Sequence, residues 1–342
     1  MSLTAELKTK ATELGFQLSG CAPAVTPTGV HRLYDWMQNG FAGEMHYFES
    51  RRDAYAHPRF VLDGAKSLLI LGMNYANQSR NDCDHGSGKI SNYAWGHVDY
   101  HDLIHKRLKI LIAGLREQHP HINARGVIDT APLLEREFAQ LAGLGWIAKN
   151  TMLINRSIGS YFFIAVLLLD IELDYDQPFD SDHCGTCTAC LDACPTDAFP
   201  SPYVLDATKC ISYLTIEHRS EIDEGLRSQF DDWIFGCDVC QAVCPWNNKN
   251  IDTLEIEFNP QADSNPLDLI GLFKIDESEF RARFRKTPLW RAKRRQILRN
   301  AAIVLGNQKY GEATDVLTQG LTEADPIVVD ACRWALNQIN EN

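Results

Sequence analysis

The chain has 342 residues, which is enough for about two domains with substantial cores. Hydrophobic residues make up 45% of it and charged residues 23%, as is ordinary for a globular protein. The net charge of -12 argues against general polyanion binding, although a local basic patch can exist on an acidic chain. The longest apolar run, residues 161–169, is far short of the roughly 20 residues that a membrane helix needs, so we expect a buried strand there and no membrane association.

Short apolar segments alternate with amphipathic ones through the first half of the chain. The periodicity predicts helices over residues 5–14, 29–39, 102–118 and 133–142, and strands over residues 16–21, 67–75, 126–128 and 161–170. Residues 77–89 are polar and rich in glycine, which predicts a flexible loop, and the acidic residues 172–182 form a linker. The alternation indicates an α/β (α+β) domain over residues 1–175.

Asp129 follows the strand at 126–128, and Pro132 opens the next predicted helix. Junctions between strand and helix often hold ligands in α/β proteins, but Asp is also a common helix N-cap. Position alone favours the cap for Asp129. The aromatic run at residues 93–101 has the ring density of a pocket wall for a large flat ligand, and equally that of a core edge with Asp99 as a cap.

Eight of the eleven cysteines lie in one stretch at metal-ligand spacings. Two-residue gaps let three thiolates of one loop converge on a 4Fe-4S cubane, and a three-residue gap followed by proline turns the fourth thiolate toward the other cluster. This pattern predicts two clusters with crossed ligands. The first is held by Cys184, Cys187, Cys190 and Cys244, and the second by Cys194, Cys210, Cys237 and Cys240. Cys210 is displaced upstream by an insertion that predicts a helix over residues 213–230.

Two other uses of these cysteines are weaker. Zinc knuckles would not need paired C-x-x-x-C-P endings, and a disulfide framework does not suit a long chain without a signal peptide. We therefore expect a ferredoxin-like domain with two 4Fe-4S clusters over residues 176–260. Such clusters imply a reducing compartment, and residues 1–4 open an amphipathic helix rather than a targeting sequence, which predicts a cytoplasmic protein.

The C-terminal part, residues 261–342, combines a basic segment with short helices. Residues 281–299 hold nine Lys or Arg and no acid, interleaved with Phe284 and Trp290, which is typical of a phosphate-binding face. The alternative is a solvated helix face paired with acids elsewhere. Helices are predicted over residues 299–305, 313–321 and 326–339, and residues 325–331 resemble the start of a HEAT-like unit. We expect a short α-helical, HEAT-like C-terminus.

Two neighbouring cubanes can carry electrons over a short path, and those electrons must reach an acceptor. A plain ferredoxin needs neither a long upstream domain nor a basic C-terminus. The organisation of the chain therefore favours an enzyme whose first domain holds a redox centre.

Four motifs resemble one family, the epoxyqueuosine reductases. They are Val127–Arg136 (VIDTAPLLER), Ala142–Asn150 (AGLGWIAKN), Tyr93–Gly96 with Asp99–His101, and Gly236–Gln241 (GCDVCQ). The resemblance covers nearly the whole chain. It implies reduction of epoxyqueuosine to queuosine at the wobble position of tRNAs of the Asp, Asn, His and Tyr type, by base-off cobalamin reduced to cob(I)alamin through the two clusters.

The resemblance also implies roles for single residues. Asp129 matches the proton donor, its carboxyl protonated in a largely buried site. Residues that match contacts to the corrinoid are Ser91, Asp129, Leu153, Ile164, Ser212, Cys237 and Asp238, and Arg219 matches a contact to tRNA. With the basic segment, the expected tRNA contacts are Arg219, Arg291, Lys293, Arg294 and Arg295. The family often carries Arg where this chain has Tyr55, so Arg51 or Arg52 is the candidate replacement.

Two rival functions come from the same features. One is a corrinoid iron-sulfur reductase of a small molecule, which would not need the basic segment. The other is an electron carrier with two clusters, which would bind no corrinoid. For the tRNA enzyme we expect a monomer that receives electrons from an external low-potential donor.

Overall fold

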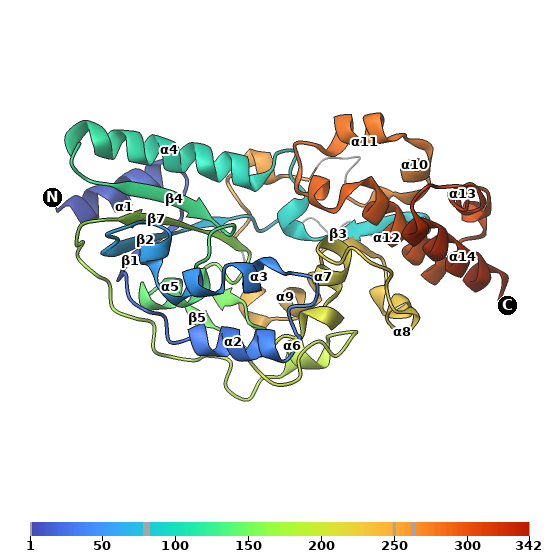
Figure 1. The fold of residues 1–342 in the computed structure, drawn as a ribbon, viewed down its shortest axis with the longest axis horizontal. Coiled ribbons are helices and arrows are strands. Elements are labelled where there is room, and N and C mark those ends of the chain that lie inside the picture. The colour runs from blue at the N-terminus through green and yellow to red at the C-terminus, as the bar shows by residue number, and fades with distance from the viewer. Residues whose placement is uncertain (1, 78–82, 249–250, 261–264, 342) are drawn as a thin grey trace.

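The computed structural model describes residues 2–77, 83–248, 251–260 and 265–341. The described part is elongated, with the N-terminus beside a four-stranded sheet at one end and the C-terminus in a group of helices at the other (Figure 1). This mixture of helices and sheets agrees with the fold class expected from the sequence. No helix in the described ranges has the length and apolar character needed to cross a membrane.

The main sheet contains β1 (Leu18–Pro23), β2 (Ser67–Asn74), β4 (Ala124–Ile128) and β7 (Phe162–Leu169). Their order is β1-β2-β7-β4, and each neighbouring pair is antiparallel. The two central strands, β2 and β7, are almost completely buried, which explains why they are nearly continuous apolar runs. The strands predicted from those runs are confirmed.

Helices cover both faces of this sheet (Figure 1). On one face, α1 (Leu3–Glu13) and α4 (Tyr100–Gln118) pack on every second residue of β2 and β7, including Leu69, Leu71 and Leu167. On the other face, α5 (Glu135–Leu141) packs on the intervening residues. Outside the sheet, α2 (Val30–Gln38) and α3 (Tyr47–Ser50) precede β2.

The predicted helix at 133–142 begins two residues late. The Thr130 and Leu133 amides donate to the Ile128 and Ala131 carbonyls in tight turns, which are not helical. The helix α5 therefore begins after its N-cap, Leu134. The capping role considered for Asp129 is therefore wrong.

The cysteine-bearing part consists of short elements. It holds α6 (Ala189–Asp192), α7 (Ile211–Ile216), α8 (Glu224–Arg227), β8 (Trp233–Phe235) and α9 (Val239–Ala242). The small hairpin of β5 (Trp146–Ile147) and β6 (Leu153–Ile154) precedes it in the chain. The single helix predicted over 213–230 is wrong. The chain turns after Ile216, where the Arg219 amide donates to the Glu44 carboxylate, and it restarts at Asp223, which caps α8.

A second sheet joins segments that are far apart in the sequence. Strand β3 (Ser87–Ile90) runs parallel to β8 and antiparallel to β9 (Leu267–Asp268). The flexible loop predicted over 77–89 is therefore wrong at its C-terminal end, since Gly88 and Ile90 are buried in the core beneath the C-terminal helices, whereas residues 78–82 lie outside the described ranges.

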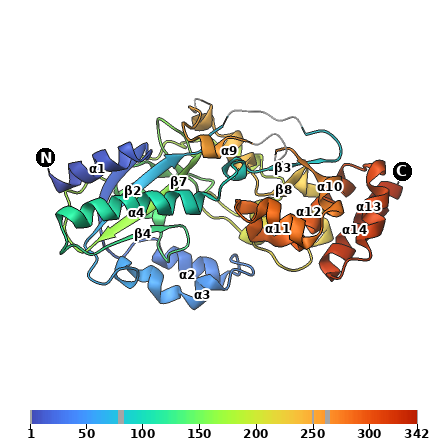
Figure 2. The same ribbon diagram turned by 90° about the horizontal axis from the view of Figure 1, so that it is seen from above.

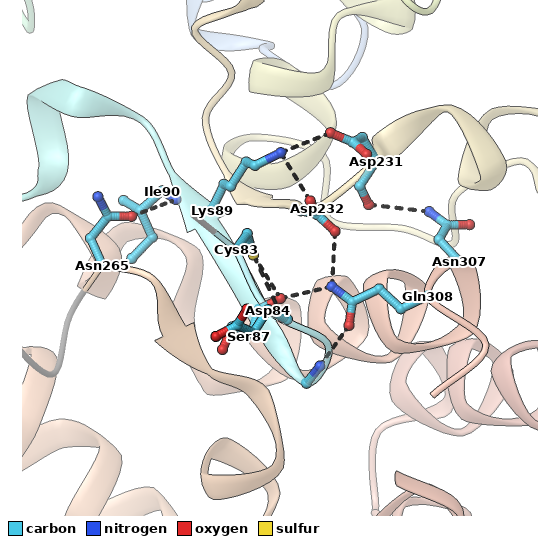
Figure 3. A network of polar contacts seen from close by, with 11 residues as sticks. Cys83, Asp84, Ser87, Lys89, Ile90, Asp231, Asp232, Asn265, Asn307 and Gln308 are labelled. Carbon is cyan, nitrogen blue, oxygen red and sulfur yellow. Dashed lines mark hydrogen bonds and ion pairs between the residues drawn. The ribbon is translucent and has the colours of Figure 1, made fainter. Parts of the chain in front are cut away.

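A polar network fixes β3 to the C-terminal helices (Figure 3). The Gln308 amide accepts from the Gly86 N–H at 2.8 Å and donates to the Ser87 carbonyl at 2.9 Å and to Asp232 at 2.8 Å. Lys89 pairs with both Asp231 and Asp232, at 3.0 and 2.9 Å. These bonds thus join β3 to the C-terminal end of α12 (Lys293–Asn307), at its C-cap Gln308.

The C-terminal part is built from α10 (Leu269–Lys274), α11 (Glu277–Phe284), α12 (Lys293–Asn307), α13 (Thr314–Gly320) and α14 (Pro326–Asn340). Helix α12 lies between α11 on one side and α13 and α14 on the other (Figure 2). Its residues Gln296–Gly306 are buried without interruption. The basic segment 281–299 is not one helix, because it spans the end of α11, the turn Pro288–Ala292 and the start of α12.

Candidate active site

Asp129 lies at the end of β4, in a backbone conformation that is rare for a residue with a side chain. Its φ is +34°, and the next amide, of Thr130, bonds back to the Ile128 carbonyl. A non-glycine residue in this region carries local strain that the surrounding structure must hold. Here the strain turns the Asp129 carboxylate toward the first turn of α4.

Two side chains of α4 form hydrogen bonds with that carboxylate. The Tyr100 hydroxyl donates to Asp129 Oδ2 at 2.5 Å, and His101 Nε2 lies 2.8 Å from Asp129 Oδ1. On its other side, His101 Nδ1 lies 2.7 Å from Asp99 Oδ1, the same atom that accepts the His101 amide as the N-cap of α4. The cap expected for Asp99 is confirmed. Asp99 also begins a series of three hydrogen-bonded side chains, Asp99, His101 and Asp129.

The charges in this hydrogen-bonded series favour a protonated His101 ring, an imidazolium, between the two carboxylates. Burial alone lowers the pKa of His101, but its bonds to Asp129 and Asp99 outweigh burial and raise the pKa to about 9. Burial alone raises the pKa of Asp129, yet the hydrogen bonds and charge of His101, with Tyr100 and Arg291, lower it. The expectation of a largely buried, protonated Asp129 is therefore wrong on two points: the Asp129 side chain is 44% exposed, and its bonds to His101 and Tyr100 lower its pKa.

A cavity of about 310 Å³ opens beside these hydrogen-bonded side chains. Its lining combines the aromatic run with the basic segment: Tyr93, Asp99, Tyr100, His101, Thr130, Pro288, Trp290 and Arg291. Arg291 is held by Glu217 at 2.7 Å, and the Lys293 ammonium lies 3.9 Å from the centre of the Trp290 ring. The fold therefore brings the aromatic ring of Trp290 and the cation of Arg291 to the catalytic candidate, although they lie 161 and 162 residues after Asp129 in the sequence.

The residues expected at a corrinoid lie at several points around the interior between the main sheet and the cysteine loops. Ser91 and the Asn92 amide both donate to the Asp238 carboxylate, which is buried and whose pKa burial raises to about 6. Leu153 lies buried on β6, Ile164 is half-buried on β7, and Ser212 is half-buried in the first turn of α7. Only Ser91 and Asp238 touch through a hydrogen bond that the structure shows.

Two enclosed acceptors, Glu135 Oε1 and Asn92 Oδ1, have no hydrogen-bond partner in the part of the chain that the structure describes, and burial raises the pKa of Glu135 to about 8. Burial also raises the pKa of Tyr75, with further contributions from Asp238 and Cys240, while Arg136 lowers it. Orphaned acceptors beside a cationic side chain fit a large ligand rimmed with amide donors, as a corrinoid is.

The cysteine thiols fall into two electrostatic groups. After burial, the pKa of Cys190 is raised by Cys184, Cys244 and Cys187. In the other group, after burial, the pKa values of Cys237 and Cys240 are raised by Cys210, and that of Cys237 also by Cys194.

The groups have the same members as the crossed ligand sets that the spacing predicts, and those sets stay a prediction. The charge of Cys190 also raises the pKa of Cys240. Within the described ranges, no group of three or more His, Cys, Asp or Glu side chains is arranged to hold a single metal ion.

The expected tRNA contacts have different surroundings. Arg294 binds Glu323 with two hydrogen bonds, at 3.1 and 2.8 Å, and Arg295 pairs with Asp325 at 3.1 Å. Arg219 donates to the Arg291 carbonyl and to Gln296, whereas Lys293 is exposed. The alternative of pairing with acids thus applies to part of the segment.

Sequence reasoning missed two residues. Arg299 is a structural arginine, 1% exposed, that donates to the Leu214, His218 and Ser220 carbonyls. His101 was seen only as part of a motif, although a histidine two residues after a capping Asp is a signal that its ring can bond the cap.

Comparisons with known proteins agree with one another. A family model described as epoxyqueuosine reductase QueG, DUF1730, matches residues 56–130, and a model of a 4Fe-4S double cluster binding domain matches residues 183–247. The epoxyqueuosine reductase of Cellulophaga algicola is 43% identical over 295 residues, which cover 86% of this chain and 95% of that one. The Escherichia coli enzyme of that name is 36% identical over 343 residues, which cover 98% and 89%.

Solved structures give the same result. An epoxyqueuosine reductase with an epoxyqueuosine-modified tRNA-Tyr stem loop has a TM-score of 0.93 and 30% identity, covering 99% of this chain and 90% of that one. The Bacillus subtilis enzyme, with the loop of its catalytic aspartate swung out of the active site, has a TM-score of 0.92 and 29% identity, covering 98% and 90%.

Proposed function

The chain belongs to the epoxyqueuosine reductase family of oxidoreductases, and from this premise we propose that it reduces epoxyqueuosine to queuosine at the wobble position of tRNA anticodons. The observation that carries the proposal is the cavity lined by Tyr100 and His101, the two partners of Asp129, together with Trp290 and Arg291 of the basic segment. This cavity offers a proton source beside a wall suited to a splayed RNA base.

Removing an epoxide oxygen as water takes two electrons and two protons. When bound and reduced, cobalamin supplies the electron pair. Asp129 is the proton donor in this proposal, and His101 holds the proton until the C–O bond begins to break. As negative charge develops on the oxygen, one proton moves from His101 Nε2 through Asp129 to that oxygen, and the imidazole is left neutral between Asp99 and Asp129. The second proton, which releases the oxygen as water, comes from solvent through the same two side chains.

The cofactor sites follow the ligand sets given above. Cys184, Cys187, Cys190 and Cys244 would hold one 4Fe-4S cluster, and Cys194, Cys210, Cys237 and Cys240 the other. Ser91, Leu153, Ile164, Ser212, Cys237 and Asp238 would line the base-off corrinoid together with Asp129. Where the family often carries arginine this chain has Tyr55, and Arg51 or Arg52 would replace it. Arg51 already donates one N–H to the Thr130 carbonyl, and Arg52 lies over the Tyr34 ring.

The proposed organisation keeps three regions: residues 1–175 bind cobalamin and substrate, residues 176–260 carry the clusters, and residues 261–342 form a HEAT-like tRNA-binding part. Arg219, Arg291, Lys293 and Arg295 would face RNA, and Arg294 would support them through Glu323. A monomer in the cytoplasm, fed by an external low-potential donor, completes the proposal.

The test is anaerobic reconstitution with iron, sulfide and cobalamin, followed by incubation with an epoxyqueuosine-modified stem loop and a reductant. We expect about eight irons and one cobalt per chain, and queuosine in the product. Full iron and cobalt content without any queuosine would refute the function, whereas iron without cobalt would indicate the electron carrier.

A further inference from the structure

A second cavity, of about 370 Å³, lies on the other side of the turn that carries Asp129. Side chains from three elements line it: Arg51 after α3, His105 on α4 and Arg125 on the edge strand β4. The turn itself contributes Thr130, which also lines the active-site cavity. The two cavities therefore adjoin each other across one residue.

Both arginines are held in place but keep hydrogen-bonding capacity. Arg51 Nη1 donates to the Thr130 carbonyl at 2.9 Å, and Arg125 Nη1 donates to the Val61 carbonyl at 2.7 Å. A guanidinium has five N–H donors, so most of them remain on each side chain. Across the described residues, no carboxylate lies within ion-pair distance of either guanidinium. Both side chains are exposed to solvent.

The charges around this cavity are mostly positive. Burial lowers the pKa of His105, and the charges of His101 and Lys109 lower it further, against Asp129 and Asp102. The Asp129 carboxylate is engaged by Tyr100 and His101 on the active-site side of the turn. Two pre-positioned guanidinium groups without an acid partner are the arrangement that proteins use for phosphate oxygens.

We propose that this cavity is a phosphate subsite, in which Arg51 and Arg125 bind a backbone phosphate next to the nucleoside whose base enters the active-site cavity. The subsite rests on the proposed function, since it needs an RNA substrate. An RNA strand would then cross the Asp129 turn, with Arg291 on one side and the two arginines on the other. Because Arg51 also holds the Thr130 carbonyl, a phosphate bound there would steady the turn that presents Asp129.

The test uses the reconstituted holoenzyme and an epoxyqueuosine-modified anticodon stem loop, with binding measured over a range of salt concentrations. The double variant Arg51→Gln/Arg125→Gln should raise Kd about tenfold and reduce the slope of log K against log salt by about 0.7, the value for one phosphate of a single strand. Arg125→Lys keeps a cation and should keep the slope. The matched control is Arg116→Gln, an exposed arginine in the last turn of α4, and it should leave both quantities unchanged.

A second arm separates RNA from the other phosphodiester in the system, the nucleotide tail of cobalamin. Binding of cobalamin is compared with binding of cobinamide, which lacks that tail. If the double variant loses only the preference for cobalamin, with an unchanged salt slope for RNA, the phosphate belongs to the cofactor and the proposal is wrong. An unchanged Kd in both arms also overturns it. A wild-type protein that neither binds nor converts the stem loop would instead overturn the proposed function.

Discussion

Replacing His101 with Gln tests whether the proton for the reaction is stored on the imidazole. The variant keeps a polar side chain of similar length but removes the cation that lies 2.7 Å from Asp99 and 2.8 Å from Asp129. In the wild type the pKa of His101 is raised to about 9, so the proton is present below that pH and is lost as the pH rises through about 9. We expect the alkaline limb of the activity profile near that value.

Without His101, the proton must be held by Asp129 itself. A carboxyl holds its proton less tightly than an imidazolium placed between two carboxylates, so the alkaline limb should move to lower pH in the variant. At pH 8, where about 90% of the wild-type imidazole is charged, activity should fall about tenfold for each pH unit by which the limb moves below pH 8. The loss should become smaller as the pH is lowered.

The assay is single-turnover conversion of an epoxyqueuosine-modified stem loop between pH 5.5 and pH 9.5, with cobalt and iron content measured in each sample. His121→Gln, an exposed histidine beyond α4, is the control and should follow the wild-type profile. An alkaline limb that stays in place in His101→Gln would refute proton storage on His101. An equal loss at every pH would show that His101 only positions Asp129.

Four further outcomes follow from the structure. Asp129→Asn should lower single-turnover conversion by about 10²- to 10⁴-fold while cobalt and iron content stay unchanged, as expected for loss of a general acid; conversion at the wild-type rate would exclude the donor role. Cys194→Ser should remove about four of about eight irons, leaving one 4Fe-4S signal in the electron paramagnetic resonance spectrum of the reduced protein, because the ligand sets are crossed. Lys293→Glu should weaken stem-loop binding without changing the melting temperature, whereas Arg294→Glu should lower the melting temperature, because its partner Glu323 would then face another carboxylate. Arg299→Met should destabilise the fold by about 3 kcal/mol or more in thermal unfolding, because it leaves buried carbonyls without donors.

Local sequence was sufficient for the features that depend on spacing along the chain. The central strands β2 and β7 were predictable because both are continuous apolar runs buried on both faces. The double cluster domain over residues 183–247 was predictable because the gap lengths decide which thiolates can reach one cubane, and the assignment of single cysteines to each cluster stays a prediction. The motif around Asp129 gave the family and the catalytic candidate.

Tertiary structure decided everything that depends on a partner far away in the sequence. Strand β3 exists because it pairs with β8 and β9, and its four residues carry too little periodicity to be recognised alone. The basic segment was one charge pattern in the sequence, but folding divides it into a pocket wall at Arg291, an ion pair at Arg294 and a buried support at Arg299.

The protonation of the site also belongs to the tertiary structure. Desolvation by itself raises the pKa of Asp129. The fold also places His101 beside it, and the hydrogen bond and charge of His101 outweigh desolvation and lower that pKa. A sequence fixes which residues can titrate, whereas the distances between them decide where the proton rests, since electrostatic interactions depend on separation in space and not along the chain.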